Sequence, residues 1–163
     1  MFKTADGIPI DAGHITKRIA DYIGQDPDAQ YEITVGTDSQ NHGQTKMVEV
    51  IAVHRHGNGG IYFYNIEYVK RIQNLRQKIN EETSRSLQVA DGLLDSLEYD
   101  LMMIGIDISD LKMSFQIHCD IGRYGKTNML IKEITKWVTS YGYLCCIKPY
   151  SYAASGIANK YSK

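Results

Sequence analysis

Three β-rich segments follow one another closely in the first half of the chain, and this run most constrains the fold. Residues 31–37, 47–54 and 61–69 are rich in Val, Ile, Tyr and Thr, which favour extended backbone. The sequence GNGG at residues 57–60 is typical of a tight hairpin turn, because Gly and Asn adopt positive φ readily. Polar residues 38–44 predict a loop between the first two segments. We therefore expect an antiparallel meander of three strands.

Helical and extended patterns alternate after the meander. The predicted helices cover residues 11–24, 72–98, 126–141 and 151–162, and two further strands cover 113–119 and 143–147. Residues 101–113 are less regular and predict a loop or edge segment. Three antiparallel strands followed by alternating helices and strands favour a ribonuclease-H-like α/β architecture. We expect one such domain over residues 1–163, with a mixed five-stranded sheet flanked by helices.

The composition limits the classes of partner. Hydrophobic residues make up 43% and charged residues 23% of the chain, as in ordinary soluble proteins. The net charge of −1 predicts only weak, salt-sensitive binding to nucleic acid, because such affinity comes mostly from Lys and Arg on phosphates. No run approaches the roughly 20 apolar residues of a membrane span, and the first residues do not resemble a signal peptide. We expect a cytoplasmic protein without membrane contact; its oligomeric state stays open.

The three cysteines, Cys119, Cys145 and Cys146, do not form a disulfide framework. Their number is odd, two are adjacent, and each lies in an apolar stretch. They resemble small buried hydrophobic residues of a protein in a reducing compartment.

Three acidic residues stand out by position. Asp38 and Asp120 each follow a predicted strand, where ligand sites of α/β sheets are found. Glu82 falls inside the apolar stripe of the long helix, and a carboxylate there is costly unless it is paired or bound to a metal. Each has a simpler interpretation: a turn residue for Asp38, a partner of a buried Lys or Arg for Glu82, and a helix cap for Asp120.

Taken together, the three acids predict a metal site. The first and fourth strands are neighbours in the expected sheet, and the long helix crosses them, so Asp38, Glu82 and Asp120 converge. Oxygen donors without a surrounding His or Cys shell suit Mg²⁺ or Mn²⁺. Two ions about 3.5–4 Å apart would hold the attacking and leaving oxygens of a phosphodiester. We expect Asp38 to bridge both ions.

Several short runs resemble the YkuK family of bacterial and phage proteins. These are Gly36-Thr37-Asp38-Ser39-Gln40, His118–Gly122, and the ending with Lys148-Pro149, Ser151–Ser155 and Ala158-Asn159. The similarity spans residue 14 to the end of the chain. It implies a ribonuclease-H-like fold and a candidate site. Enzymes of this fold usually add a fourth acidic residue or a His from the final helix, whereas here Asn159 is the nearest substitute.

Other residues near these acids are candidates for substrate contact: Ser39, Gln40, His118, Lys148 and Asn159. His118 alternates with Asp120 on one strand and would be placed to move a proton, although a strand His is more often a core or edge residue. Lys148 follows the last strand and would neutralise a phosphate, or would be an ordinary surface Lys.

Two functions follow from these patterns. The first is a metal-dependent nuclease acting on RNA, an RNA–DNA hybrid or structured DNA. The second is a module that binds nucleic acid or protein and has lost efficient metal binding. The inward Glu82 and the two Asp residues favour the first; the near-neutral charge and the missing fourth acid favour the second.

Overall fold

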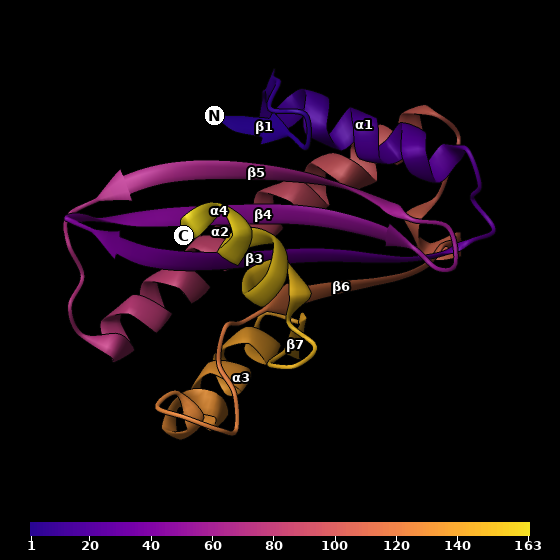
Figure 1. Cartoon of the computed structure of the whole chain (residues 1–163). Helices are drawn as coiled ribbons and strands as arrows, with labels where there is room; N and C mark the ends of the chain where they lie inside the picture. Colours follow the sequence, from indigo (N-terminus) through magenta and orange to yellow (C-terminus); the bar gives the residue numbers. More distant parts are fainter.

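A seven-stranded mixed sheet forms the centre of the molecule in the computed structural model, which describes residues 1–163 (Figure 1). Its strand order is β2-β1-β5-β4-β3-β6-β7. The strands are β1 (Phe2–Thr4), β2 (Pro9–Ile10), β3 (Gln30–His42), β4 (Gln44–Arg55), β5 (Gly60–Val69), β6 (Lys112–His118) and β7 (Leu144–Cys146). The mixed α/β architecture expected from the sequence is confirmed, with seven strands rather than five.

The expected meander is present, but the loop predicted at residues 38–44 is wrong. β3 and β4 pair continuously from Tyr31↔Arg55 to His42↔Gln44, and Gly43 alone turns the chain, with φ of 88°. Asp38 and Ser39 are buried and bonded to residues far away in the sequence, so their polarity does not mark a loop, whereas residues 41–44 are exposed. Asp38 therefore lies within a strand and not at its end.

The two additional strands lie at the start of the chain. β1 pairs with β2 and with β5, which extends the sheet beyond the meander. These strands have three and two residues, too few for the alternating pattern by which strands are recognised in a sequence.

The four predicted helices are present, and one short helical segment between the second and the third was not predicted. They are α1 (Ala12–Gly24), α2 (Leu75–Met103), η1 (Ile108–Asp110), η2 (Asn128–Leu130), α3 (Ile131–Ser140), the π-helical segment η3 (Ala153–Ala158) and α4 (Asn159–Ser162). The less regular segment expected over residues 101–113 is shorter than predicted and covers residues 104–111, because α2 continues to Met103, with Leu101 fully buried, and β6 begins at Lys112. No helix combines the length and the hydropathy that a bilayer span requires.

Helices cover both faces of the sheet (Figure 1). α1 and α2 pack on the face that carries Ile33, Val35 and Ile51. The terminal helix, η3 with α4, lies on the opposite face over β3 and β4, where Val50 contacts it. Side chains alternate between these faces along each strand, so each residue of β3 belongs to one layer or the other.

A glycine sets the distance between the terminal helix and the sheet. A Cβ atom at Gly36 would lie 2.7 Å from the backbone nitrogen of Ala154 and 2.9 Å from the carbonyl carbon of Ala153. No other residue type fits there without displacing the helix. Gly36 thus allows the close approach that brings the end of the chain onto β3.

Candidate metal centre

The candidate site lies where two parallel strands separate. β3 and β6 pair from Gln30↔Lys112 to Gly36↔His118, and the chain then leaves β3 and turns toward β7. The backbone nitrogen of Cys119 instead donates to the carbonyl oxygen of Cys146. β3 continues beyond Gly36 without a neighbour on that side. Crevices at the carboxyl ends of parallel strands are the usual ligand sites of α/β sheets.

Asp38 lies beside this opening on β3, with 0% of its surface exposed. Its Oδ2 accepts hydrogen bonds from Asn159 Nδ2 at 3.0 Å and from Ser162 Oγ at 2.7 Å. Its Oδ1 is buried and accepts no hydrogen bond. A buried polar atom without a partner is costly and uncommon in folded proteins. The terminal helix therefore holds one oxygen of Asp38 and leaves the other free.

Glu82 approaches from α2, as its place in the apolar stripe predicts, and is 4% exposed. Ser39 Oγ lies 3.4 Å from Glu82 Oε2 and donates to it. None of the ion pairs in the structure includes Glu82. The simpler interpretation, in which Glu82 pairs with a buried Lys or Arg, is therefore not supported. Burial, together with the negative charge of Asp38, raises the pKa of Glu82 well above its ordinary value.

Asp120 follows β6 and is half-buried. Its Oδ1 accepts a hydrogen bond from Ser155 Oγ at 2.7 Å and lies 3.2 Å from Lys148 Nζ. Burial opposes ionisation of Asp120, but the Ser155 hydrogen bond and the Lys148 charge outweigh it, and the pKa of Asp120 falls below its ordinary value. Asp120 is the carboxylate of the three that stays ionised most easily.

The three carboxyl groups influence one another. Burial is the main cause that raises the pKa of Asp38, and the negative charge of Asp120 adds to it. Carboxylates that repel in this way are relieved by a proton or by a cation. The one set of His, Cys, Asp or Glu side chains whose ligand atoms all lie within 4.8 Å of one another lies elsewhere, so the three acids are not one closed coordination shell. Glu82 and Asp120 both line one small cavity, and Asp38 lies outside its lining.

The predicted substrate contacts fall into two groups. Ser39 and Asn159 are occupied in orienting Glu82 and Asp38, respectively. Gln40 lies on the same face of β3 as Asp38, two residues nearer the hairpin, and is half-buried. Lys148 is half-exposed beside Asp120. Gln40 and Lys148 therefore take no part in orienting Asp38 or Glu82.

His118 is fully engaged in the fold. Its Nδ1 accepts a hydrogen bond from the backbone nitrogen of Ala153 at 3.0 Å, and its Nε2 lies 3.0 Å from Gln116 Oε1. The first contact requires a neutral ring with the proton on Nε2. Burial lowers the pKa of His118 to about 4. Neither nitrogen is free, so this geometry favours the interpretation of His118 as a core residue over a role in proton transfer.

A cavity beside Asp120 contains residues that the sequence pattern did not single out. It has a volume of about 570 Å³ and is lined by Gly122, Arg123, Tyr124, Ile147, Lys148, Pro149 and Tyr150. Tyr124 and Tyr150 are largely exposed. Cationic and aromatic side chains together are suited to phosphates and bases. The available signal was the run Arg123-Tyr124, which predicts only a flexible loop when taken alone.

Comparisons with known proteins agree with this fold. A family model described as Ribonuclease H-like matches residues 14–163. A curated protein of Bacillus subtilis (strain 168), "Uncharacterized protein YkuK", is 34% identical over 153 residues, which cover 91% of this chain and 89% of the relative. No solved structure matches the chain significantly.

Proposed function

The chain belongs to the ribonuclease H-like family, and on that premise we propose that it is a metal-dependent nuclease. Its substrate class is RNA, an RNA–DNA hybrid or structured DNA, and its action is hydrolysis of a phosphodiester bond. One observation carries the proposal: Asp38 Oδ1 is buried without a hydrogen bond, the negative charge of Asp120 acts on Asp38, and that of Asp38 acts on the buried Glu82.

The donor set fits a hard divalent cation. Asp38, Glu82 and Asp120 offer only oxygen atoms, which Mg²⁺ and Mn²⁺ prefer. The Oδ1 of Asp38 gives such an ion a buried ligand atom that accepts no hydrogen bond. When bound, the ions, two in our proposal, supply an activated water and neutralise charge that develops on the phosphodiester.

The chain's own residues would bind and position the polymer. Lys148 lies between Asp120 and the cavity, so its ammonium group is placed to hold a phosphate next to the carboxylates. Arg123, which also lines the cavity, would contact a neighbouring phosphate, and the exposed Tyr124 and Tyr150 would stack on unpaired bases. Few cations are involved, which agrees with the weak, salt-sensitive binding that the net charge predicts.

A second candidate function is a nucleic-acid-binding or protein-binding module without efficient catalysis. The observation that favours it is Asn159, which occupies the terminal helix where an acid would add a ligand. Its amide nitrogen donates a hydrogen bond to Asp38 and so stabilises part of the negative charge that a cation would otherwise stabilise. The same cavity would serve this function, without hydrolysis.

Cleavage assays on end-labelled single-stranded RNA, RNA–DNA hybrid and branched DNA separate the two functions. We expect product with Mg²⁺ or Mn²⁺, none with EDTA, and a loss of at least about 100-fold in Asp38→Asn and Asp120→Asn, as for removal of a group that stabilises developing charge. Asp28→Asn, a matched change at an exposed turn residue, should cleave like the wild type.

The contrary result is equally clear. Cleavage that persists in purified Asp38→Asn would come from another site or a contaminant, and the nuclease proposal would be abandoned. Tight binding of the same polymers with no metal-dependent product in the wild type would support the binding module.

A further inference from the structure

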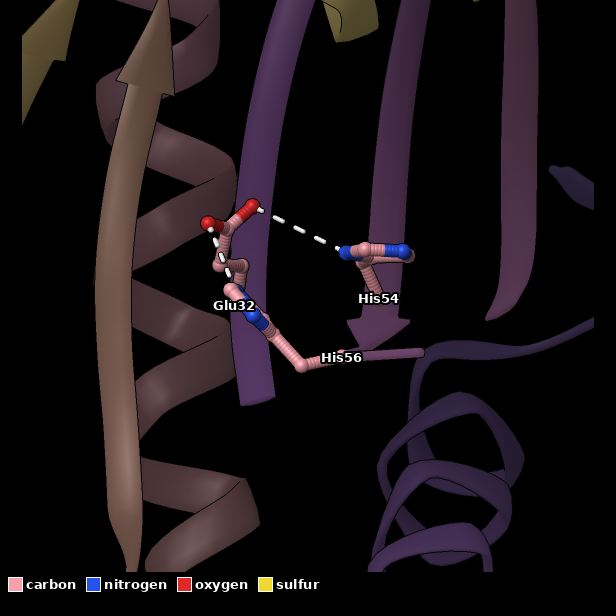
Figure 2. A group of neighbouring side chains, drawn as sticks. All are labelled: Glu32, His54 and His56. Carbon is pink, nitrogen blue, oxygen red and sulfur yellow. Dashed lines mark hydrogen bonds and ion pairs between the residues drawn. The ribbon is translucent and has the colours of Figure 1, made fainter. Parts of the chain in front are cut away.

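Two histidines converge on one carboxylate at the other end of β3, away from the candidate metal centre (Figure 2). His56 Nε2 lies 3.3 Å from Glu32 Oε1, and His54 Nδ1 lies 4.0 Å from Glu32 Oε2. Ligand atoms of the three side chains all lie within 4.8 Å of one another. Both imidazole rings point toward the carboxylate in Figure 2.

The backbone fixes this arrangement. Glu32 and His54 face each other directly in the β3–β4 ladder. His56 lies two residues further along, so it projects from the same face of the sheet as His54. Its backbone nitrogen donates to the carbonyl oxygen of Gln30 at 2.9 Å, which continues the pairing past the end of β4. Three ligand-type side chains are thus presented by paired backbone.

As ion pairs, the contacts among Glu32, His54 and His56 contribute little to the stability of the fold. The side chains of His54 and His56 are 46% and 48% exposed, and that of Glu32 is 27% exposed. Ion pairs in such settings contribute about 0–1 kcal/mol. Solvent access leaves room for a cation and for water to complete its coordination.

We propose that Glu32, His54 and His56 form a second metal site, which binds a divalent transition-metal ion of the Zn²⁺ class. Imidazole nitrogens suit Zn²⁺, and two of them with one carboxylate make a three-ligand site with an open position. Mg²⁺ prefers all-oxygen ligands, so this site and the carboxylate cluster select different ions. Glu32 and Asp38 are six residues apart on β3, about 20 Å at roughly 3.3 Å per residue.

A fourth residue supports the carboxylate. Tyr152 Oη donates to Glu32 Oε2 at 3.4 Å from the start of the terminal helix. Hydrogen bonds of this kind orient ligating carboxylates and raise metal affinity. Tyr152 is a positioning residue in this site, and its hydroxyl ties the site to the helix that also contacts Asp38.

Calorimetric titration of the EDTA-stripped, full-length chain with ZnCl₂ tests the proposal. We expect about one tight site per chain, weakened more than about tenfold in His54→Ala, His56→Ala and Glu32→Gln, and less in Tyr152→Phe. Asp120→Asn should bind zinc with the affinity of the wild type, because Asp120 is not part of this site. The zinc result is therefore independent of whether the chain is a nuclease.

His14 provides the matched control. It is 71% exposed and contacts Asp11 at 2.7 Å, which makes the same kind of His–carboxylate pair without a second histidine. His14→Ala should keep full zinc affinity. A wild-type chain without a zinc site, or one whose affinity survives loss of both His54 and His56, overturns the proposal. Loss of zinc binding in Cys145→Ser alone would assign the metal to the cysteines and overturn it as well.

A measurement on the wild type avoids any question of misfolded variants. Substoichiometric Co²⁺ should broaden the imidazole proton resonances of His54 and His56 first and leave those of His14 sharp. Broadening of His14 before the other two, or uniform broadening of all, contradicts the proposed site.

Discussion

Ser162 Oγ donates a 2.7 Å hydrogen bond to Asp38 Oδ2, joining the terminal helix to the central strand across 124 residues of sequence. Asn159 reaches the same oxygen from the preceding turn. These two donors decide which oxygen of Asp38 is free. The terminal helix therefore orients a candidate metal ligand without supplying an acidic ligand itself.

Asn159→Asp should strengthen metal binding and weaken the metal-free fold. The new carboxylate loses the hydrogen bond to Asp38 Oδ2 and adds a negative charge beside it, which we expect to cost about 1–3 kcal/mol in EDTA. In Mg²⁺ or Mn²⁺ the same charge becomes a ligand, so affinity rises. Urea denaturation in both conditions and Mn²⁺ titration followed by electron paramagnetic resonance provide the measurements. Asn159→Ala loses the hydrogen bond without adding a ligand and serves as control; equal Mn²⁺ affinity of the Asp and Ala variants would contradict the prediction.

Glu82→Gln should be more stable than the wild type in EDTA, and increasingly so as the pH rises. Burial raises the pKa of Glu82 well above its ordinary 4.5, so between that value and the pKa of the folded state the folded chain binds more protons than the unfolded chain. Stability from Glu82 is thus fully present below about pH 4.5 and is lost as the pH rises through the folded value. Gln does not titrate.

Chemical denaturation at pH 5 and pH 8 measures this effect. We expect an advantage for Glu82→Gln of roughly 1–3 kcal/mol at the higher pH, the usual cost of a poorly paired buried polar group, and a smaller one at pH 5. Saturating Mg²⁺ should stabilise the wild type and not the variant. A stability difference that is independent of pH would show that Glu82 ionises normally.

Gly36→Ala should destabilise the protein, whereas Gly92→Ala should stabilise it. A Cβ at Gly36 would lie 2.7 Å from the backbone nitrogen of Ala154, while a Cβ at Gly92 in α2 meets nothing within 4 Å. Overpacking costs about 1–3 kcal/mol, and replacing a helical Gly by Ala gains about 0.5–1 kcal/mol. Equilibrium urea unfolding compares the two. Limited proteolysis should cleave the terminal helix faster in Gly36→Ala only; equal effects of both substitutions would rule out the close approach as the cause.

Lys148→Ala and Arg123→Ala should each lower the affinity for nucleic acid and make that affinity less dependent on salt concentration. Each cation removed from the cavity is one fewer phosphate contact, so the slope of log K against log [salt] should fall by about 0.7 for a single strand. Fluorescence anisotropy at several NaCl concentrations measures the slope. Lys17→Ala, on α1, is the control and should leave it unchanged; a drop of similar size there would mean that binding is diffuse.

His118 should remain neutral in the folded protein at any pH above about 5. Burial lowers its pKa to about 4, and the Ala153 backbone nitrogen needs the unprotonated Nδ1 as acceptor. Because the unfolded chain takes up this proton near pH 6.5, His118 removes stability as the pH falls from about 6.5 toward 4. Its imidazole proton chemical shifts should stay constant between pH 8 and pH 5.5; a midpoint near 6.5 would contradict the buried, doubly bonded geometry.

Local patterns predict the long elements of this chain well. The apolar stripe of α2 places Glu82 correctly because helical periodicity depends on neighbours within a few turns. By contrast, the polar run that begins at Asp38 and Ser39 resembles a loop until its partners are known. Those partners, Ser162 and Glu82 among them, come from other parts of the chain, and no local signal identifies them.

The roles of Asn159, Arg123 and Tyr124 could not be predicted from the sequence, and the reason is physical. Asn159 resembles a weak substitute for an acid in the sequence, but the structure has its amide donating to Asp38, a role fixed by the close packing at Gly36. Arg123 and Tyr124 become part of a cavity only because Lys148 lies across Gly122 from another segment. Side-chain roles that depend on contacts between distant segments are settled by packing and not by spacing.

The terminal helix touches both ends of β3, since Tyr152 contacts Glu32 and Ser162 contacts Asp38. Lifting that helix from the sheet would break both sets of contacts together, so the two ends should open as one cooperative unit in amide hydrogen exchange. A ligand that orders one end of β3 would then lower the entropy cost of binding a second ligand at the other end. The two sites would be coupled without any change in the average structure.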